Sequence, residues 1–75
     1  MMRDAKVIAT VACRLKLFRE RARYTQKEVS KITGITEVSI SRYENMERVP
    51  DALMLYKLAE CYGVSVADFY KSGGS

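Results

Sequence analysis

Apolar residues recur at spacings of three and four along the first third of the chain, as on one buried face of a helix. The residues on this face are Ile8, Val11, Leu15, Phe18 and Ala22. Most of the basic residues of this segment lie on the flanks of the face. The pattern therefore predicts a first helix from about Asp4 or Ala5 to Arg23.

A strong helix start follows directly. Thr25 precedes Glu28 by three positions, the spacing of a capping box in which each side chain binds the other residue's backbone amide. Gly34 then interrupts the pattern, and glycine readily adopts the left-handed conformation that ends a helix. We therefore predict a short second helix followed by a tight turn.

Thr36 is a suitable N-cap for a third helix that runs through Asn45. Steps of 100° per residue place Ile40 and Tyr43 on its inward side. Pro50, in the segment 49–51, ends this helix and precedes the next one.

A helix-spaced apolar stripe predicts a fourth helix, closed by Gly63. The stripe comprises Ala52, Leu55, Leu58, Ala59 and Tyr62. Ser65 and Asp68 repeat the capping-box spacing and predict a short fifth helix that carries Phe69.

Strand-like alternation, internal repeats and an interdomain linker are absent from the sequence. We therefore expect an all-α fold, a compact five-helix bundle with a helix-turn-helix. Residues 1–14 are expected to extend the first helix, residues 15–70 to form the helix-turn-helix domain, and residues 71–75 to form a flexible tail. A chain of 75 residues has room for one hydrophobic core, and its 48% hydrophobic and 29% charged residues are typical of a folded domain.

Composition excludes several classes of function. The chain has no His and only two cysteines, Cys13 and Cys61, so it lacks the ligands of a tetrahedral zinc site and the usual general base of nucleophilic catalysis. We expect no metal, no cofactor and no enzymatic activity. The apolar run 7–12 is shorter than a signal sequence or a membrane span, which favours a cytoplasmic protein without membrane contact.

The positive charge is concentrated in the first part of the chain. Residues 1–31 contain nine basic and three acidic residues, whereas residues 32–75 contain four basic and six acidic ones. The net charge of +4 favours an anionic partner, although charged runs of this kind also occur on ordinary solvated helix faces.

Two short helices joined at Gly34, the second with a polar outer face, meet the physical requirement for a helix-turn-helix. The chain resembles the Xre family of helix-turn-helix proteins, which includes the lambdoid phage repressors. The segments that carry the resemblance are 25–30, 34–36, 39–45, Pro50, Leu58 with Ala59, and 63–65, within Leu15 to about Phe69. The resemblance implies a transcriptional regulator that binds double-stranded DNA, expected to be a repressor acting as a homodimer on a two-fold operator.

With Ile40 inward, the opposite side of the third helix is predicted to read bases in the major groove. The predicted base-reading residues are Glu37, Val38, Ser41, Arg42 and Asn45. Arg42 can pair with guanine and Val38 can contact a thymine methyl group. Glu37 could accept from cytosine or simply complement the helix dipole.

Most of the phosphate contacts are expected near the starts of the second and third helices, and Arg48, after the third helix, is a further candidate. The candidates are Gln26, Lys27, Thr36, Ser39 and Arg48. Gln26 matches the family's phosphate-binding glutamine, whereas Thr36 and Ser39 could instead only cap the third helix. The resemblance also implies a partly buried ion pair between Arg19 and Glu44.

Val66, Phe69 and Tyr70 match the position of the dimer contact in short relatives, and Leu53 or Tyr56 could extend it. The alternative for Val66 and Phe69 is that they complete the core of the monomer.

The chain departs from the family at Arg23 and Met46, where relatives often have glycine. We expect Met46 to take a different loop path, because a non-glycine residue is strained at positive φ.

Two other functions are compatible with the same sequence. The protein could be the antitoxin of a toxin-antitoxin pair, with exposed apolar residues such as Leu17 on a toxin-binding surface. It could also be the DNA-binding module of a longer, ligand-sensing regulator.

Overall fold

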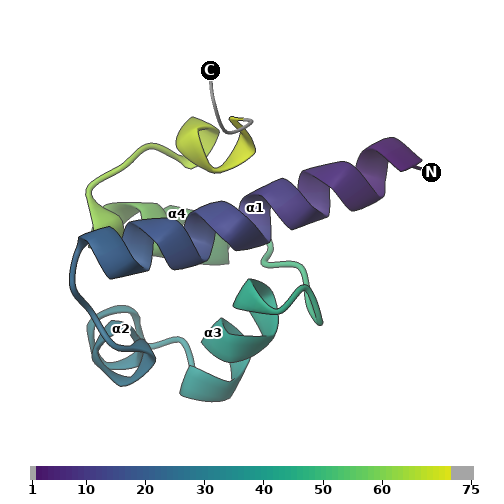
Figure 1. Ribbon diagram of the computed structural model, residues 1–75. Coiled ribbons are helices and arrows are strands. Elements are labelled where there is room, and N and C mark those ends of the chain that lie inside the picture. Colours follow the sequence, from purple (N-terminus) through teal and green to yellow (C-terminus); the bar gives the residue numbers. More distant parts are fainter. Residues whose placement is uncertain (1, 72–75) are drawn as a thin grey trace.

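The computed structural model describes residues 2–71, and every regular element in this range is helical (Figure 1). The elements are α1 (Met2–Arg21), α2 (Gln26–Thr33), α3 (Glu37–Glu44), α4 (Ala52–Tyr62) and the 3-10 helix η1 (Val66–Tyr70). The prediction of an all-α bundle with a helix-turn-helix is confirmed. The predicted flexible tail, 71–75, lies outside the described residues except for Lys71.

The first helix begins and ends two residues earlier than the periodic pattern suggested. Arg23 leaves the helical conformation with a φ of 63°, and its backbone N–H donates to Glu20 O at 3.0 Å. A residue in the left-handed region cannot continue a right-handed helix. Arg23 therefore ends α1 in a left-handed conformation, which a glycine would adopt without strain.

The helix-turn-helix unit begins and ends at the predicted caps. Thr25 Oγ1 accepts from Glu28 N at 3.1 Å, and Thr25 N donates to Glu28 Oε1 at 2.8 Å, which completes the capping box. Gly34 closes α2 with a φ of 79°, and Thr36 caps α3 by accepting from Ser39 N at 3.1 Å. Ile35, between these caps, is buried in the core.

The connection from α3 to α4 does not follow the expected path. Met46 adopts a φ of 62°, so the prediction that it would avoid the left-handed conformation is wrong. Its N–H donates to Tyr43 O at 3.4 Å, and Glu47 N donates to Arg42 O at 2.8 Å. These bonds satisfy carbonyls at the end of α3 and hold the turn despite the strain at Met46.

The core lies between α1 and the elements packed on it, α3, α4 and η1, while α2 packs on α3 and α4 (Figure 1). Its fully buried large side chains are Leu15, Val29, Ile40, Leu58 and Phe69. Tyr43 is also buried, as the inward side predicted for α3 requires. All five elements contribute to this core, so each helix is fixed relative to α1.

The last element closes the core rather than standing apart from it. Phe69 is 0% exposed, and its ring centroid lies 5.6 Å from that of Phe18. Of the two roles left open for Phe69, its burial favours completion of the monomer core. Val66 is half-buried against the same core, and Tyr70 remains exposed.

The predicted fifth helix is a single 3-10 segment tied down at both ends. Ser65 N donates to Asp68 Oδ2 at 2.9 Å, and Lys71 Nζ lies 3.0 Å from Asp68 Oδ1. The hydrogen bond from the Ser65 backbone, followed by that from Lys71, lowers the pKa of Asp68 to about 2. Arg14 Nε on α1 also donates to Lys71 O at 3.0 Å.

Within residues 2–71, no helix has both the length and the apolar character needed to cross a membrane.

Candidate nucleic-acid interface

The outward face of α3 is open to solvent along its length. Glu37, Arg42 and Asn45 are exposed, and Val38 is 61% exposed. Ser41 is half-buried, and Asn45 Nδ2 donates to its Oγ at 3.3 Å. The structure thus places the five predicted base-reading residues on α3 and its C-cap Asn45, opposite the buried Ile40 and Tyr43.

The hydroxyl groups at the start of α3 are already engaged with each other. Thr36 Oγ1 caps the helix and also donates to Ser39 Oγ at 2.9 Å. Ser39 is half-buried and Thr36 is exposed. Capping is therefore a role that both the sequence and the geometry support, and a phosphate contact by either residue remains a prediction.

A buried carboxylate links α1, α2 and α3. Glu44 Oε2 lies 2.7 Å from Arg19 Nε, and Glu44 Oε1 accepts from an Arg19 terminal nitrogen at 3.0 Å. The two side chains are only 4% and 13% exposed, for Glu44 and Arg19 respectively. A fork of two parallel hydrogen bonds fixes both distance and orientation. This is the ion pair that the family resemblance implies.

Gln26 joins the same carboxylate, which the sequence did not indicate. Its Nε2 donates to Glu44 Oε1 at 3.1 Å, and Arg19 also donates to Tyr24 O at 2.9 Å. Gln26 is eighteen positions from Glu44, so no local pattern could have shown this contact. We call Arg19, Gln26 and Glu44 the Glu44 cluster.

Tyr62 lies in the electrostatic neighbourhood of this cluster. Burial, followed by the negative charge of Glu44, raises the pKa of Tyr62 above its ordinary range. Its Oη is buried and has no hydrogen-bond partner among residues 2–71. The hydrogen bond that Arg19 donates to Glu44 raises the pKa of Arg19. The sequence pattern predicts only that Tyr62 belongs to an apolar stripe, because its neighbours across helices are set by tertiary packing.

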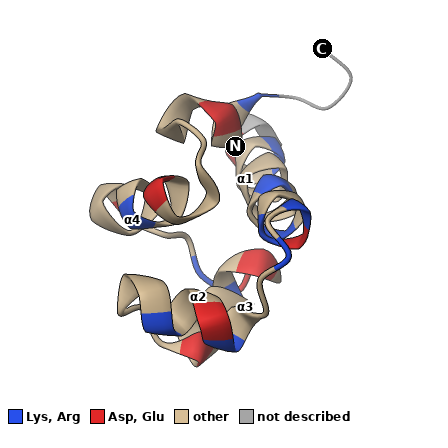
Figure 2. Cartoon of the chain, turned by 90° about the vertical axis from the view of Figure 1, so that its left-hand side faces the viewer, with Lys and Arg blue, Asp and Glu red and all other residues tan. Residues whose placement is uncertain are grey.

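The basic residues are spread over several elements (Figure 2). Figure 2 shows blue segments along α1 and on α2, with red segments also present on the α2 and α3 side. Lys27 and Arg48, both candidates for phosphate contacts, are exposed. The interface therefore carries charges of both signs, and its positive charges are exposed side chains.

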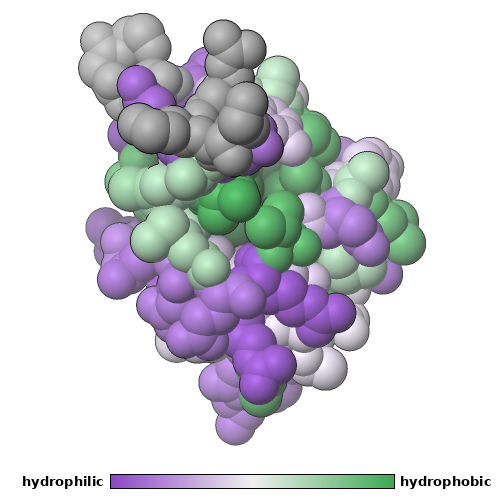
Figure 3. All heavy atoms as spheres, turned by 90° about the vertical axis from the view of Figure 1, so that its right-hand side faces the viewer, coloured by the Kyte–Doolittle hydropathy of each residue, from purple (hydrophilic) through white to green (hydrophobic). Residues whose placement is uncertain are grey.

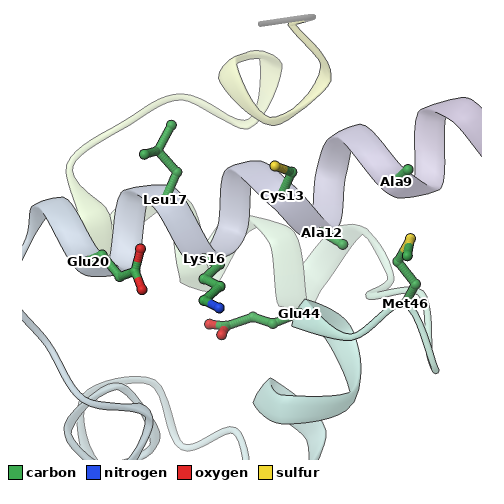
Figure 4. A pocket seen from close by; sticks show the side chains of 8 residues that line it. All are labelled: Ala9, Ala12, Cys13, Lys16, Leu17, Glu20, Glu44 and Met46. Atoms are coloured by element: carbon green, nitrogen blue, oxygen red, sulfur yellow. The ribbon is translucent and has the colours of Figure 1, made fainter.

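A shallow hollow of about 530 Å³ lies beside the Glu44 cluster (Figure 4). Figure 4 shows Lys16 and Glu44 extending toward one another, while Leu17 and Cys13 point away from α3. The only other ionisable carboxylate in its lining is Glu20. Glu44 is already bound by Arg19, so its carboxylate serves the support of α3, and Cys13 and Lys16 also line the hollow.

Comparison with known proteins agrees with this geometry. Residues 15–69, more than half of the chain, match a family model described as helix-turn-helix. The HTH-type transcriptional regulator ImmR of Bacillus subtilis (strain 168) is 44% identical over 52 residues, which are 69% of this chain and 41% of ImmR. The matched segment thus spans less than half of that relative's length. No solved structure gives a significant match.

The two capped helices, the left-handed Gly34 turn and the exposed face of α3 define a helix-turn-helix protein. The chain belongs to the Xre family of helix-turn-helix proteins, a family of DNA-binding transcriptional regulators.

Proposed function

We propose that the protein binds double-stranded DNA in a sequence-specific way and represses transcription as a dimer on a two-fold operator. The observation that carries this proposal is the exposed outer face of α3, held on α1 and α2 by the Glu44 cluster. A reading helix needs an accessible polar face and a fixed orientation, and α3 has both.

Base recognition would come from α3 in the major groove. Arg42 can form two hydrogen bonds to guanine O6 and N7, and Val38 can contact a thymine methyl group. Glu37 lies in the first turn of α3, where it can complement the helix dipole or accept from cytosine. Ser41 and Asn45 would act together, since they already share a hydrogen bond.

Phosphate binding would come mainly from the start of α2. Gln26 is the first residue of α2, where backbone amides point outward and favour an anion. A side-chain amide has two N–H groups. One of those of Gln26 is used by Glu44, so the second is left for a phosphate oxygen. Lys27, Thr36, Ser39 and Arg48 are the further phosphate contacts that we propose.

Selection of binding sites from random duplex DNA tests this function. We expect enrichment of a short half-site repeated with two-fold symmetry, the two centres about 34 Å or one helical turn apart. Enrichment of an unrepeated half-site would support DNA reading and contradict the two-fold operator. A failure to enrich any sequence would contradict sequence-specific binding itself.

A further inference from the structure

An apolar notch opens at the end of the molecule where α1 begins. It has a volume of about 160 Å³ and lies between α1, the connection from α3 to α4, and η1. Its lining is mostly apolar and includes Val7, Ile8, Val49, Pro50, Leu55 and Tyr70. We call this surface the apolar notch.

The walls of the notch are more exposed than its floor. Val49, Tyr70 and Val7 are 59%, 51% and 40% exposed, whereas Pro50 and Leu55 are buried. Figure 3 views the molecule from this end and shows apolar side chains gathered in the middle of the face, with hydrophilic ones below them. Several large apolar side chains exposed around one hollow indicate a binding surface more than a scatter of single residues would.

We propose that the apolar notch is the contact surface between two copies of this chain. The proposal rests on the proposed function, which requires two protomers on one operator. One wall, with Val7 and Ile8, belongs to the part of α1 that precedes residues 15–69, the segment shared with the helix-turn-helix family. This chain's own extension of α1 therefore contributes to the contact.

The shape of the protomer favours contact at this end. The molecule measures 34 × 24 × 19 Å, and the 20 residues of α1 span about 30 Å of its length. Two copies that meet at the starts of their α1 helices have centres separated by about one protomer length. That separation matches the distance of about 34 Å between half-sites one DNA turn apart.

The position of α3 is compatible with this arrangement. Figure 1 shows α2 and α3 together on the lower side of the molecule, while the start of α1 and the α3–α4 connection lie at its right-hand end. A two-fold axis placed at that end and running vertically in this view leaves both α3 helices on the lower side. Both could then face one DNA duplex.

The charges around the notch favour a second copy over a strongly charged partner. Arg48 lies in the lining, Lys6 precedes Val7 in the chain, and Lys71 follows Tyr70. Glu47 and Asp51 flank the α3–α4 segment of the lining, and all five of these residues are exposed. In a two-fold contact, the charged residues around the notch of one protomer face the same residues of its copy. Charges of mixed sign can then pair across the contact, whereas charges of one sign would repel.

Three single substitutions at exposed positions test the contact. Val49→Glu and Val7→Glu place a carboxylate on opposite walls of the notch. Ile32→Glu is the matched control, because Ile32 is 55% exposed on α2 and lines a separate groove, away from the notch. Thermal melts followed by circular dichroism establish whether each variant is folded. If one notch variant does not fold, the other still tests the contact.

Sedimentation equilibrium gives the oligomeric state, and titration with duplexes carrying one or two half-sites gives DNA affinity. We expect the wild type and Ile32→Glu to dimerise and the folded notch variants to dimerise at least about tenfold more weakly, a difference of about 1.4 kcal/mol. The notch variants should bind a single half-site like the wild type and lose affinity only on the two-half-site duplex.

Two results would overturn the proposal. One is a wild-type chain that stays monomeric and binds a two-half-site duplex as one protomer, which would leave the notch to another protein such as a toxin. The other is unchanged self-association in both notch variants. A dimer that is broken by the notch variants but binds no DNA would support the contact and contradict the proposed function.

Discussion

Arg42 is the residue on α3 with the most to contribute to recognition. It is exposed in the last turn of α3, and its neighbour Tyr43 is buried, so the backbone beneath it is fixed. A guanidinium placed in this way can distinguish guanine from the other bases by two hydrogen bonds. Its effect should therefore depend on the DNA sequence.

Substituting Arg42 with alanine should weaken binding to the selected operator by about 1–3 kcal/mol and relax the preference at one base position per half-site. Titration of the operator and of a scrambled duplex measures both effects. Arg48→Ala is the matched control, because we expect Arg48 to contact phosphate and its loss to affect both duplexes alike. An equal loss of affinity for both duplexes in Arg42→Ala would show that Arg42 contacts DNA phosphates and does not read a base.

Arg19 contributes to the fold rather than to DNA contact. Its side chain is 13% exposed and supplies both hydrogen bonds of the fork on Glu44. Removing one partner of a buried pair leaves the other charge unpaired, which costs about 3–5 kcal/mol.

Arg19→Met should therefore lower the free energy of unfolding by a few kcal/mol, measured by urea denaturation, with DNA affinity falling as α3 loses its support. Arg21→Met, at an exposed position on the same helix, is the control and should change stability little. Equal stability of the two variants would show that the pair contributes no more than a surface contact.

The local elements were largely predictable from the sequence because their signals are local. The Thr25 capping box, the Gly34 turn and the inward pair Ile40 and Tyr43 each depend on residues within a few positions. The contact of Gln26 with Glu44 and the buried Tyr62 hydroxyl depend on how helices cross, which no short pattern records. Local pattern could not separate the two roles open to Phe69 either, since a core contact and a dimer contact both require an apolar residue.

The turn after α3 adopts a backbone conformation that the local preference of its residues disfavours. Met46 takes a φ of 62° although left-handed backbone is unfavourable for a residue with a side chain. The hydrogen bonds of the turn and the burial of Pro50 beyond it fix the chain path. Tertiary structure therefore outweighs the local preference of Met46.

Met46→Gly should raise the free energy of unfolding by about 0.5–1 kcal/mol, because glycine adopts this conformation without strain. The midpoint of urea unfolding is the measurement. Glu47→Gly, one position later and not at positive φ, should destabilise, since there glycine only adds freedom to the unfolded chain. A loss of stability in Met46→Gly would show that the methionine side chain contributes packing that outweighs the strain.

At the scale of the whole molecule, the charge distribution governs how binding responds to salt. Basic residues outnumber acidic ones in residues 1–31, and Lys27 is exposed at the start of α2. Each phosphate that a protein neutralises releases a counterion, so the logarithm of affinity falls with the logarithm of salt concentration.

We expect a steep decrease of operator affinity with salt, and Lys27→Ala should reduce its slope by about 1 while weakening binding to all sequences. Titrations at several salt concentrations provide the slope. Lys57→Ala, which removes the same charge from α4, should leave the slope nearly unchanged. A flat response in the wild type would contradict a phosphate-based interface.

The packing of η1 on α1 has a kinetic consequence. The first and last elements of the fold meet at Phe18 and Phe69, fifty-one positions apart, so their contact closes a loop that spans most of the described chain. The chain loses conformational entropy on closing this loop before the contact can stabilise it. We therefore expect η1 to dock on α1 after the transition state for folding.

Phe69→Leu should then destabilise the protein by about 1–2 kcal/mol, almost entirely through faster unfolding, by about tenfold, with the folding rate preserved. Stopped-flow folding and unfolding in urea separate the two rates, and a change confined to the folding rate would place this contact in the nucleus instead. In the expected case, the packing of the five-residue helix η1 determines how slowly the native state unfolds. The helix-turn-helix then determines how quickly the native state forms.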